Sequence, residues 1–276
     1  MSDINTYADQ TAIDALTPIT GDLVLRESDN NVLLWNGSAW KSFAPDVASS
    51  SFSSTYSVEF DGTNMYMETG VPIVTGTTPI SLSGWVYLTS TPSDYDQAIA
   101  IRGSTTWYSA RMLGFVNGRL HFNTFASELR GTTSVSVNTW HHIAATCTSS
   151  GAARVYLNGV LEASGSVVYN SVALGNTFAI ARGGVGEALP AKIDEAAVWD
   201  SVLSDGGVSV GSTAGGDIAT LYNSGAPGDI SSLSPVGWWR MGDDDGGTGT
   251  TITDQGSGGN DGTLTNGPTF STDVPS

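Results

Sequence analysis

Apolar and polar residues alternate along most of the chain after residue 55, which is the pattern of β-strands with one buried face. In ISLSGWVYL (80–88), the aliphatic side chains fall on one face of the strand, and the aromatic side chains of Trp85 and Tyr87 fall on the other. Both faces of this strand are therefore partly apolar. We expect it to lie in a β-sandwich and to be covered on its outer side as well.

Two Asn-Gly pairs separate alternating runs, and each predicts a tight hairpin. Asn117-Gly118 joins MLGFV to RLHFN, and Asn158-Gly159 joins ARVYL to VLEAS. Type I′ turns need a positive φ at both central residues, which Asn and Gly tolerate best. The sequence therefore predicts two antiparallel hairpins.

After residue 55, residues 203–225 are the one region with the spacing of a helix. Ile218, Leu221 and Tyr222 recur at intervals of three and four residues, and Gly225 is placed to end the element. We predict one or two helical turns there.

The first 46 residues have the features of a small separate unit. GDLVLRES and DNNVLLWNGSAWKSFAP indicate three short strands, with Asn36-Gly37 at a hairpin corner, and a short helix capped by Asp9 is expected before them. Residues 47–55 have the small polar composition of a linker, so the predicted domains are residues 1–46 and 56–276. Because so small a unit buries little surface, we expect it to anchor or oligomerise by packing on a neighbour or on a copy of itself.

The composition of the chain excludes several classes of function. The chain has 276 residues, 34 of them Gly, and only 13% are charged, which favours short strands and tight turns. A net charge of −17 offers no cationic surface for phosphate groups, so nucleic-acid binding is excluded. Nothing approaches the roughly 20 apolar residues that cross a bilayer, and the amino terminus lacks the pattern of a signal peptide. Cys147 is single and is expected to be buried, so no disulfide framework is predicted.

Several segments after residue 55 have an order and spacing that point to one family. They are SVEFDGTNMYMETG (57–70), ISLSGWVYL (80–88), WHHIAATCTSSGAARVYLNGVLEASG (140–165), KIDEAAVWDSVLS (192–204) and DIATLYNSG (217–225). Together they resemble laminin-G-like, concanavalin A-like jelly-roll domains. The resemblance implies an all-β fold, in which an antiparallel jelly-roll β-sandwich follows a small β-meander unit.

One block stands in an unexpected place. Residues 238–270 resemble the block that usually opens such a domain, yet here they close the chain. In a circularly permuted arrangement their strands would pair beside residues 56–60, because the termini of sandwiches commonly lie close together. A truncated second domain is the alternative, but it would leave apolar strands unpaired. We therefore predict the permuted arrangement.

The amino-terminal segment GDLVLRESDNNVLLWNGSAWKSF (21–43) resembles short segments of phage tail and fibre proteins. Joined to a laminin-G-like sandwich without signal peptide or disulfides, it indicates an external structural protein of a bacteriophage virion, as a fibre, appendage or capsid decoration assembled in the host cytoplasm. The expected partners are other virion proteins, further copies of the chain, with a trimer favoured, and a host cell-surface glycan. A free carbohydrate-binding lectin and a glycoside hydrolase are the alternatives.

No catalytic constellation is expected. Retaining glycosidases place two carboxyl groups about 5 Å apart, whereas Asp194 and Glu195 are adjacent and would point to opposite faces of a strand. His141 and His142 are also neighbours, and we expect His142 to face the core and His141 to meet solvent. We therefore predict that the protein is not an enzyme.

The resemblance also implies a candidate calcium site. Laminin-G-like domains often bind Ca²⁺ at an edge of the sandwich through one or two Asp carboxylates and backbone carbonyls, which suits a hard cation. By resemblance, the candidate ligands are Asp61, Asp194 and Asp254. The acidic run at residues 243–245 repels itself and could also collect a cation, although an exposed turn explains it better.

Trp107 and Tyr108 are candidate glycan contacts. They stand in GSTTWYSAR, a predicted loop in which aromatic rings could stack on a sugar. For the other tryptophans we expect core or interface packing.

Overall fold

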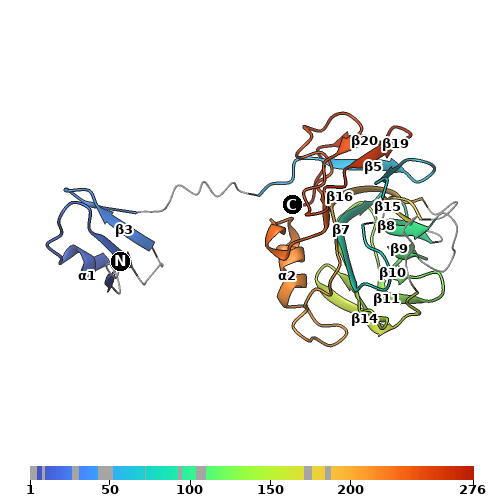
Figure 1. Cartoon of the computed structure of the whole chain (residues 1–276), viewed down its shortest axis with the longest axis horizontal. Coiled ribbons are helices and arrows are strands. Elements are labelled where there is room, and N and C mark those ends of the chain that lie inside the picture. Colours follow the sequence, from blue (N-terminus) through green and yellow to red (C-terminus); the bar gives the residue numbers. More distant parts are fainter. Residues whose placement is uncertain are drawn as a thin grey trace. The chain divides into compact units, whose positions relative to one another are not determined.

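The computed structural model describes residues 5–7, 10–26, 31–42, 52–71, 73–92, 95–103, 110–170, 176–183 and 188–276. The chain forms two compact units, Met1–Ser51 and Phe52–Ser276 (Figure 1). The helices and strands are, in chain order, β1 (Asn5–Tyr7), α1 (Gln10–Asp14), β2 (Leu23–Arg26), β3 (Asn31–Trp35), β4 (Trp40–Ser42), β5 (Ser57–Asp61), β6 (Tyr66–Glu68), β7 (Ile80–Leu88), β8 (Asp96–Gly103), β9 (Arg111–Val116), β10 (Arg119–Asn123), β11 (Glu128–Ser134), β12 (Trp140–Cys147), β13 (Ala152–Leu157), β14 (Val160–Ser166), β15 (Asn176–Ile180), β16 (Pro190–Trp199), α2 (Gly216–Tyr222), the 3₁₀ turns η1 (Asn223–Gly225) and η2 (Ser231–Leu233), β17 (Gly237–Trp239), β18 (Thr251–Ile252), β19 (Gly262–Thr265) and β20 (Thr269–Ser271).

The amino-terminal unit is a four-stranded sheet with one short helix. Its strand order is β1-β2-β3-β4, with β1 parallel to β2 and the other pairs antiparallel. The three predicted strands are β2, β3 and β4, whereas β1 was not predicted. The predicted corner at Asn36-Gly37 is confirmed, and the Asn36 side chain closes it by accepting hydrogen bonds from the N–H groups of Ser38 and Ala39. A small apolar core lies under the sheet and consists of Ile13, Val24 and Leu33.

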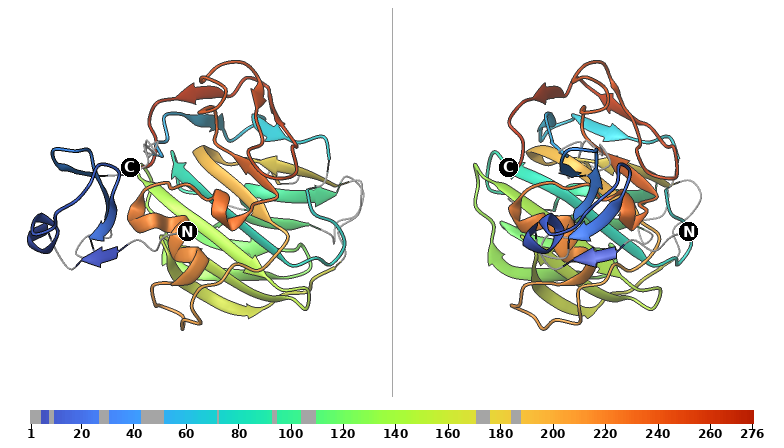
Figure 2. Two further views of the ribbon diagram at one scale, coloured as in Figure 1. Left: turned by 60° about the vertical axis from the view of Figure 1, so that its left-hand side comes forward. Right: turned by 90° about the vertical axis from the view of Figure 1, so that its left-hand side faces the viewer.

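The larger unit is a sandwich of two stacked sheets (Figures 1 and 2). The first sheet has the order β14-β13-β12-β7-β16-β5-β20, with β17 also paired to β16, and the second sheet has the order β11-β10-β9-β8-β15-β6-β19-β18. All these strand pairs are antiparallel. The predicted all-β, antiparallel sandwich is therefore confirmed.

Both predicted Asn-Gly hairpins are present. They connect β9 to β10 and β13 to β14. Asn117 and Gly118 have φ values of 49° and 69°, and Asn158 and Gly159 have φ values of 49° and 73°. Positive φ at both central residues is the geometry of a type I′ turn, so the residue types explain the register of these pairs.

The carboxyl-terminal block completes both sheets, and Figure 1 shows β20 beside β5. In the first sheet Phe270 of β20 pairs with Val58 of β5, and in the second sheet Leu264 of β19 pairs with Met67 of β6. The predicted pairing of the block at residues 238–270 with the strand near residue 58 is confirmed for β20, whereas β17 pairs with β16 and β19 pairs with β6. The last strands of the chain are therefore part of the sandwich ladder and do not form a separate domain.

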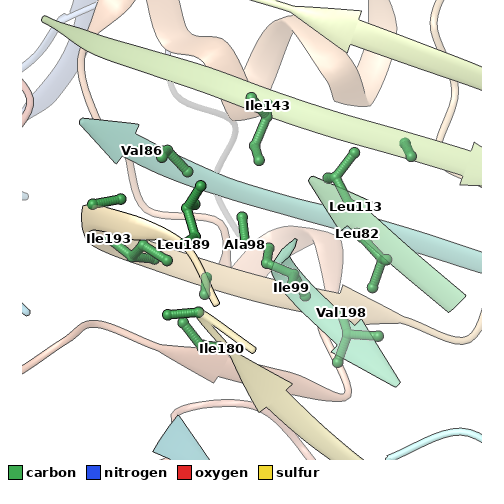
Figure 3. Packing of buried hydrophobic residues seen from close by; sticks show 14 of the residues in the cluster. Leu82, Val86, Ala98, Ile99, Leu113, Ile143, Ile180, Leu189, Ile193 and Val198 are labelled. Carbon is green, nitrogen blue, oxygen red and sulfur yellow. The ribbon is translucent and has the colours of Figure 1, made fainter. Parts of the chain in front are cut away.

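The main core fills the space between the sheets (Figure 3). Leu82 and Val86 of β7 point toward Ile99 and Leu113 of the second sheet, as their alternation predicts. These side chains are fully or almost fully buried, and the same layer includes Ile143, Ile180, Leu189, Ile193 and Val198.

A second apolar layer covers the outer side of the first sheet. The helix α2 and the segments around it pack there, and the Tyr222 ring stacks on Trp85 with centroids 6.1 Å apart. The expected outer cover of β7 is therefore present, and Trp85 is only 4% exposed. The helix is the predicted short element, although it ends at Tyr222, where Asn223 caps it in the left-handed conformation, and not at Gly225. Within the described ranges, no helix is long and apolar enough to cross a membrane.

Candidate functional site

A pocket of about 320 Å³ opens where β10 and β11 meet in the second sheet. Phe122 of β10 points into the core, so the next residue, Asn123, lies on the outer side of the sheet. Two aromatic rings and three polar side chains line the pocket, namely Tyr95, Phe125, Asn123, Ser127 and Glu128. A concave site with apolar walls and a few polar groups is the usual form of a small-molecule binding site.

A tight turn after β10 shapes one wall of the pocket. The Thr124 N–H donates to the Ser127 carbonyl at 3.0 Å, and the Phe125 N–H donates to Asn123 Oδ1 at 2.5 Å. Phe125 has a φ of 63°, a left-handed conformation that a non-glycine residue adopts only when the surrounding structure holds it. The turn therefore fixes the Phe125 ring in the pocket wall.

A chain of polar contacts supports another part of the pocket wall. Glu128 Oε1 lies 2.5 Å from Arg130 Nη2, and the same guanidinium nitrogen donates to the Tyr95 hydroxyl at 3.3 Å. His121 Nδ1 lies 3.4 Å from Glu128 Oε2, and the rings of His121 and Tyr95 meet with centroids 5.4 Å apart. Tyr95 keeps 38% of its surface exposed, so its ring is open to a ligand.

His121 supports this wall from below and carries no charge at neutral pH. Burial lowers the pKa of His121 to about 4, although the Glu128 carboxylate acts in the opposite direction. The Gln97 amide nitrogen donates to the Tyr95 carbonyl at 2.9 Å and lies 3.2 Å from His121 Nε2. His121 Nε2 therefore accepts and Nδ1 donates, which orients the Glu128 carboxylate.

The predicted glycan contacts, Trp107 and Tyr108, lie outside the described residues. The residues that line the pocket were not predicted. Their signal in the sequence is weak, because Asn123 and Phe125 stand in an ordinary polar turn after a strand, and Tyr95 lies some thirty positions earlier.

The predicted calcium ligands have separate roles in the fold. The Asp61 carboxylate accepts hydrogen bonds from the N–H groups of residues 63–65, and these bonds lower its pKa against the effect of burial. The Asp254 carboxylate accepts them from the N–H groups of Trp238, Gly256 and Asn260. Asp194 is fully buried on β16. In the described part of the chain, no three His, Cys, Asp or Glu side chains form a group that could hold a metal, and calcium binding stays a prediction.

Asp194 and Glu195 share one face of β16, which corrects the expectation that they point to opposite faces. Ile193 and Ala196 both face the main core, so two consecutive residues between them lie on the outer side. The register of β16 against β7 shifts between Asp194 and Ala197, and Glu195 has a φ of 48°. This β-bulge breaks the period of two and turns Glu195 to the side of Asp194.

The bulge creates an enclosed acid pair. Asp194 accepts a hydrogen bond from Ser54 Oγ at 2.5 Å, and Glu195 accepts bonds from Trp238 Nε1 at 2.6 Å and from Arg240 Nε at 3.1 Å. Burial, reinforced by the neighbouring Glu195, raises the pKa of Asp194 well above its ordinary value. Burial also raises the pKa of Glu195 to about 7, although Arg240 acts against this change. The pair joins residues 52–56 to the carboxyl-terminal block and is closed to a sugar-sized ligand.

The acidic run at residues 243–245 is a turn, as expected, but its first member is not simply exposed. Asp243 Oδ1 accepts the N–H groups of Thr55 and Tyr56, each at 2.8 Å, and Asp243 Oδ2 accepts Arg240 Nη2 at 2.7 Å. These donors and the Arg240 charge compensate the carboxylate that was expected to repel its neighbours.

His141 and His142 are both buried, which corrects the expectation that His141 meets solvent. His141 is 8% exposed because Ser136 and Asn158 enclose and hydrogen-bond its ring. His142 is 1% exposed and lies under the outer layer, next to Trp85, not in the main core. Its Nε2 lies 2.8 Å from Ser83 Oγ, and burial lowers its pKa to about 3.

Comparison with known proteins places this fold in a family. Residues 61–209 match the model of the concanavalin A-like lectin/glucanases superfamily. No curated protein is similar enough to count as a relative. A putative carbohydrate binding protein from Bacteroides ovatus has a similar structure, with a TM-score of 0.59 and 19% identity over 96% of this chain and 72% of that chain.

Two further structures are similar over about half of the chain. A heptameric SAP-like pentraxin from Limulus polyphemus has a TM-score of 0.45 and 14% identity over 55% of this chain and 78% of that chain. Domain 4 of a GH43 extracellular arabinanase from Geobacillus stearothermophilus, in complex with arabinotriose, has a TM-score of 0.44 and 18% identity over 54% of this chain and 72% of that chain. The match to the family model covers more than half of the residues of this chain, and the chain therefore belongs to the concanavalin A-like lectin/glucanases superfamily.

Proposed function

We propose that the protein binds a glycan in the pocket between β10 and β11. The observation that carries the proposal is the combination of an exposed Tyr95 ring and the Phe125 ring with the polar groups of Asn123, Ser127 and Glu128 around one cavity. A sugar ring has an apolar face that stacks on aromatic side chains and hydroxyl groups that need nearby donors and acceptors. The similar protein from Bacteroides ovatus, described as a putative carbohydrate binding protein, agrees with this proposal.

The site is proposed as a binding site without catalysis. The acid pair Asp194 and Glu195 now shares a face, as a glycosidase requires, but the two residues are 0% and 6% exposed. The cavity beside Glu195 holds about 10 Å³, which is room for one water molecule at most. The segment GVSVG (207–211) has the spacing of a nucleophile elbow, yet Ser209 lies exposed in an irregular loop and not at a strand-to-helix turn.

Replacement of Tyr95 by alanine tests the proposed pocket. We expect affinity for a bound glycan to fall at least about tenfold, equivalent to about 1.4 kcal/mol, because the stacking surface is lost. Isothermal titration calorimetry on the full chain measures this change, once a glycan array has identified the ligand. Tyr87→Ala is the matched control, since Tyr87 is a half-buried tyrosine on the outer face of the first sheet. Equal affinities for wild type and Tyr95→Ala would show that the pocket is not the binding site.

We further propose that the chain acts as an external component of a bacteriophage particle, with the sandwich presenting the pocket and the amino-terminal unit anchoring it. The small unit supports this proposal, because the buried apolar core of its described residues consists of Ile13, Val24 and Leu33, which is little for a unit that folds by itself. A neighbouring surface would add to the apolar area that the unit buries. A trimer would supply that surface through further copies of the chain.

Association with particles is the expected result of that second proposal. An antibody against the sandwich should label purified particles in electron micrographs, and light scattering should give a multiple of 28.6 kDa. A chain that is missing from the particles and is monomeric at high concentration would contradict both the particle role and the trimer.

A further inference from the structure

Glu128 in the pocket wall forms a charge pair with Arg130, and this pair affects the charge of the pocket more than it affects the stability of the fold. Glu128 Oε1 and Arg130 Nη2 are 2.5 Å apart, and their side chains are 28% and 40% exposed. A partly exposed pair of this kind contributes little to the free energy of unfolding. Its effect on the charge of the pocket is direct, because Glu128 lines the cavity and Arg130 holds both Glu128 and the Tyr95 hydroxyl.

The pair leaves no uncompensated cation for an acidic ligand. Arg130 is the cation that the described residues bring to this wall, its Nη2 atom contacts both Glu128 and Tyr95, and the Glu128 carboxylate compensates its charge. His121 lies behind the pair, and it is uncharged at neutral pH because burial lowers its pKa. The chain as a whole has a net charge of −17, which repels anions before they reach the pocket.

The pair equally leaves no uncompensated carboxylate for a cationic ligand. The charge of Glu128 is compensated by Arg130 in a charge-assisted hydrogen bond, while its other oxygen faces His121 Nδ1 at 3.4 Å. The lone pairs of Glu128 that remain open can accept hydrogen bonds from sugar hydroxyls, and the Asn123 amide and the Ser127 hydroxyl lie on the same cavity.

We infer that the Glu128–Arg130 pair makes the pocket selective for uncharged sugars and against sugars that carry a carboxylate or an ammonium group. This inference rests on the proposed glycan-binding function and names the ligand class of the same site. Glu128 contacts the ligand directly, and Arg130 sets the charge that Glu128 presents.

Reciprocal variants test the selection. Glu128→Gln frees the Arg130 guanidinium, so affinity for oligosaccharides that contain uronic or sialic acid should rise at least about tenfold. Arg130→Gln leaves the charge of Glu128 uncompensated, so affinity for oligosaccharides of glucosamine should rise by a similar factor. Both variants should melt within a few degrees of the wild type, because the exposed pair adds little stability. Glu59→Gln, an exposed acid on β5 of the other sheet, should keep the wild-type preference.

The probes are uncharged, acidic and amino oligosaccharides of equal length, titrated into the full chain and into each variant in a weakly acidic buffer in which the amino sugars are protonated and His121 is still neutral. Wild-type preference for the uncharged series, with the two opposite changes of preference in the variants, supports the inference. Variants that keep the wild-type preference overturn it. Wild-type binding to the acidic or amino series that Tyr95→Ala abolishes also overturns it, while the proposed function stands. Absence of wild-type binding to any series, or binding that Tyr95→Ala leaves unchanged, overturns the proposed function itself.

Discussion

Replacement of Trp239 by alanine should lower the free energy of unfolding by about 3 to 5 kcal/mol. Trp239 is 0% exposed, and its ring stacks on Phe178 with centroids 4.4 Å apart. Its indole nitrogen donates to the Asn260 carbonyl at 3.1 Å, so the substitution also removes a hydrogen bond. The cavity would open where β17 packs against the second sheet, and urea unfolding followed by circular dichroism measures the loss.

Trp140→Ala is the matched control for this prediction. Trp140 is a tryptophan of the first sheet that is only half buried, with its indole nitrogen 3.1 Å from Asp273 Oδ1 near the end of the chain. We expect a loss of about 1 kcal/mol there, as for a partly exposed side chain. If both variants lose the same stability, the carboxyl-terminal block does not contribute a central core side chain as described. Trp239→Phe, which keeps an aromatic ring, should fall between the wild type and Trp239→Ala.

The architecture of the sandwich follows from patterns that act over a few residues. The alternation in residues 80–88 predicts both the core side and the covered outer side of β7, and each face is buried as expected. Asn117-Gly118 and Asn158-Gly159 predict their hairpins because few residue types accept the required backbone conformation. The pairing of β20 with β5 is not a local property, and the resemblance to a known domain predicted it.

The bulge in β16 shows where such patterns fail. An argument from a period of two assigns Asp194 and Glu195 to opposite faces, and one extra residue in the strand reverses that assignment for Glu195. Glutamate gives no local sign of a positive φ, unlike Asn or Gly. The contacts that hold this conformation come from Trp238 and Arg240, which lie more than forty positions away along the chain.

The pocket could not be predicted for a related reason. Tyr95 directly precedes β8, Asn123 ends β10 and Glu128 begins β11, and only the sheet brings the three residues together. Taken one by one, these three residue types are common in turns and on exposed strand faces, so none of them indicates a binding site. The interpretation of Trp107 and Tyr108 as glycan contacts placed binding in the loop between β8 and β9, and it stays a prediction.

Acidification should remove the stabilising contribution that neutral His142 makes to the wild type. The pKa of His142 is lowered to about 3 in the folded chain by burial, whereas an unfolded histidine titrates near 6.5. As the pH falls below about 6.5, His142 binds a proton in the unfolded chain but not in the folded chain. The free energy of unfolding therefore decreases. Between pH 6.5 and 4 this single residue should account for about 3 kcal/mol of lost stability.

Comparison of His142→Gln with His141→Gln isolates that contribution. Glutamine does not titrate, so His142→Gln should lose about 3 kcal/mol less than the wild type when urea unfolding at pH 4 is compared with unfolding at neutral pH. The acid pair on β16 also titrates, but it is unchanged in both variants, so its effect cancels from the difference. Burial lowers the pKa of His141 too, yet the hydrogen bond that its ring donates to the Ser136 carbonyl acts against the shift, and its substitution should flatten the pH dependence less. Equal slopes for the two variants would mean that the enclosed position of His142 under α2 does not govern its protonation.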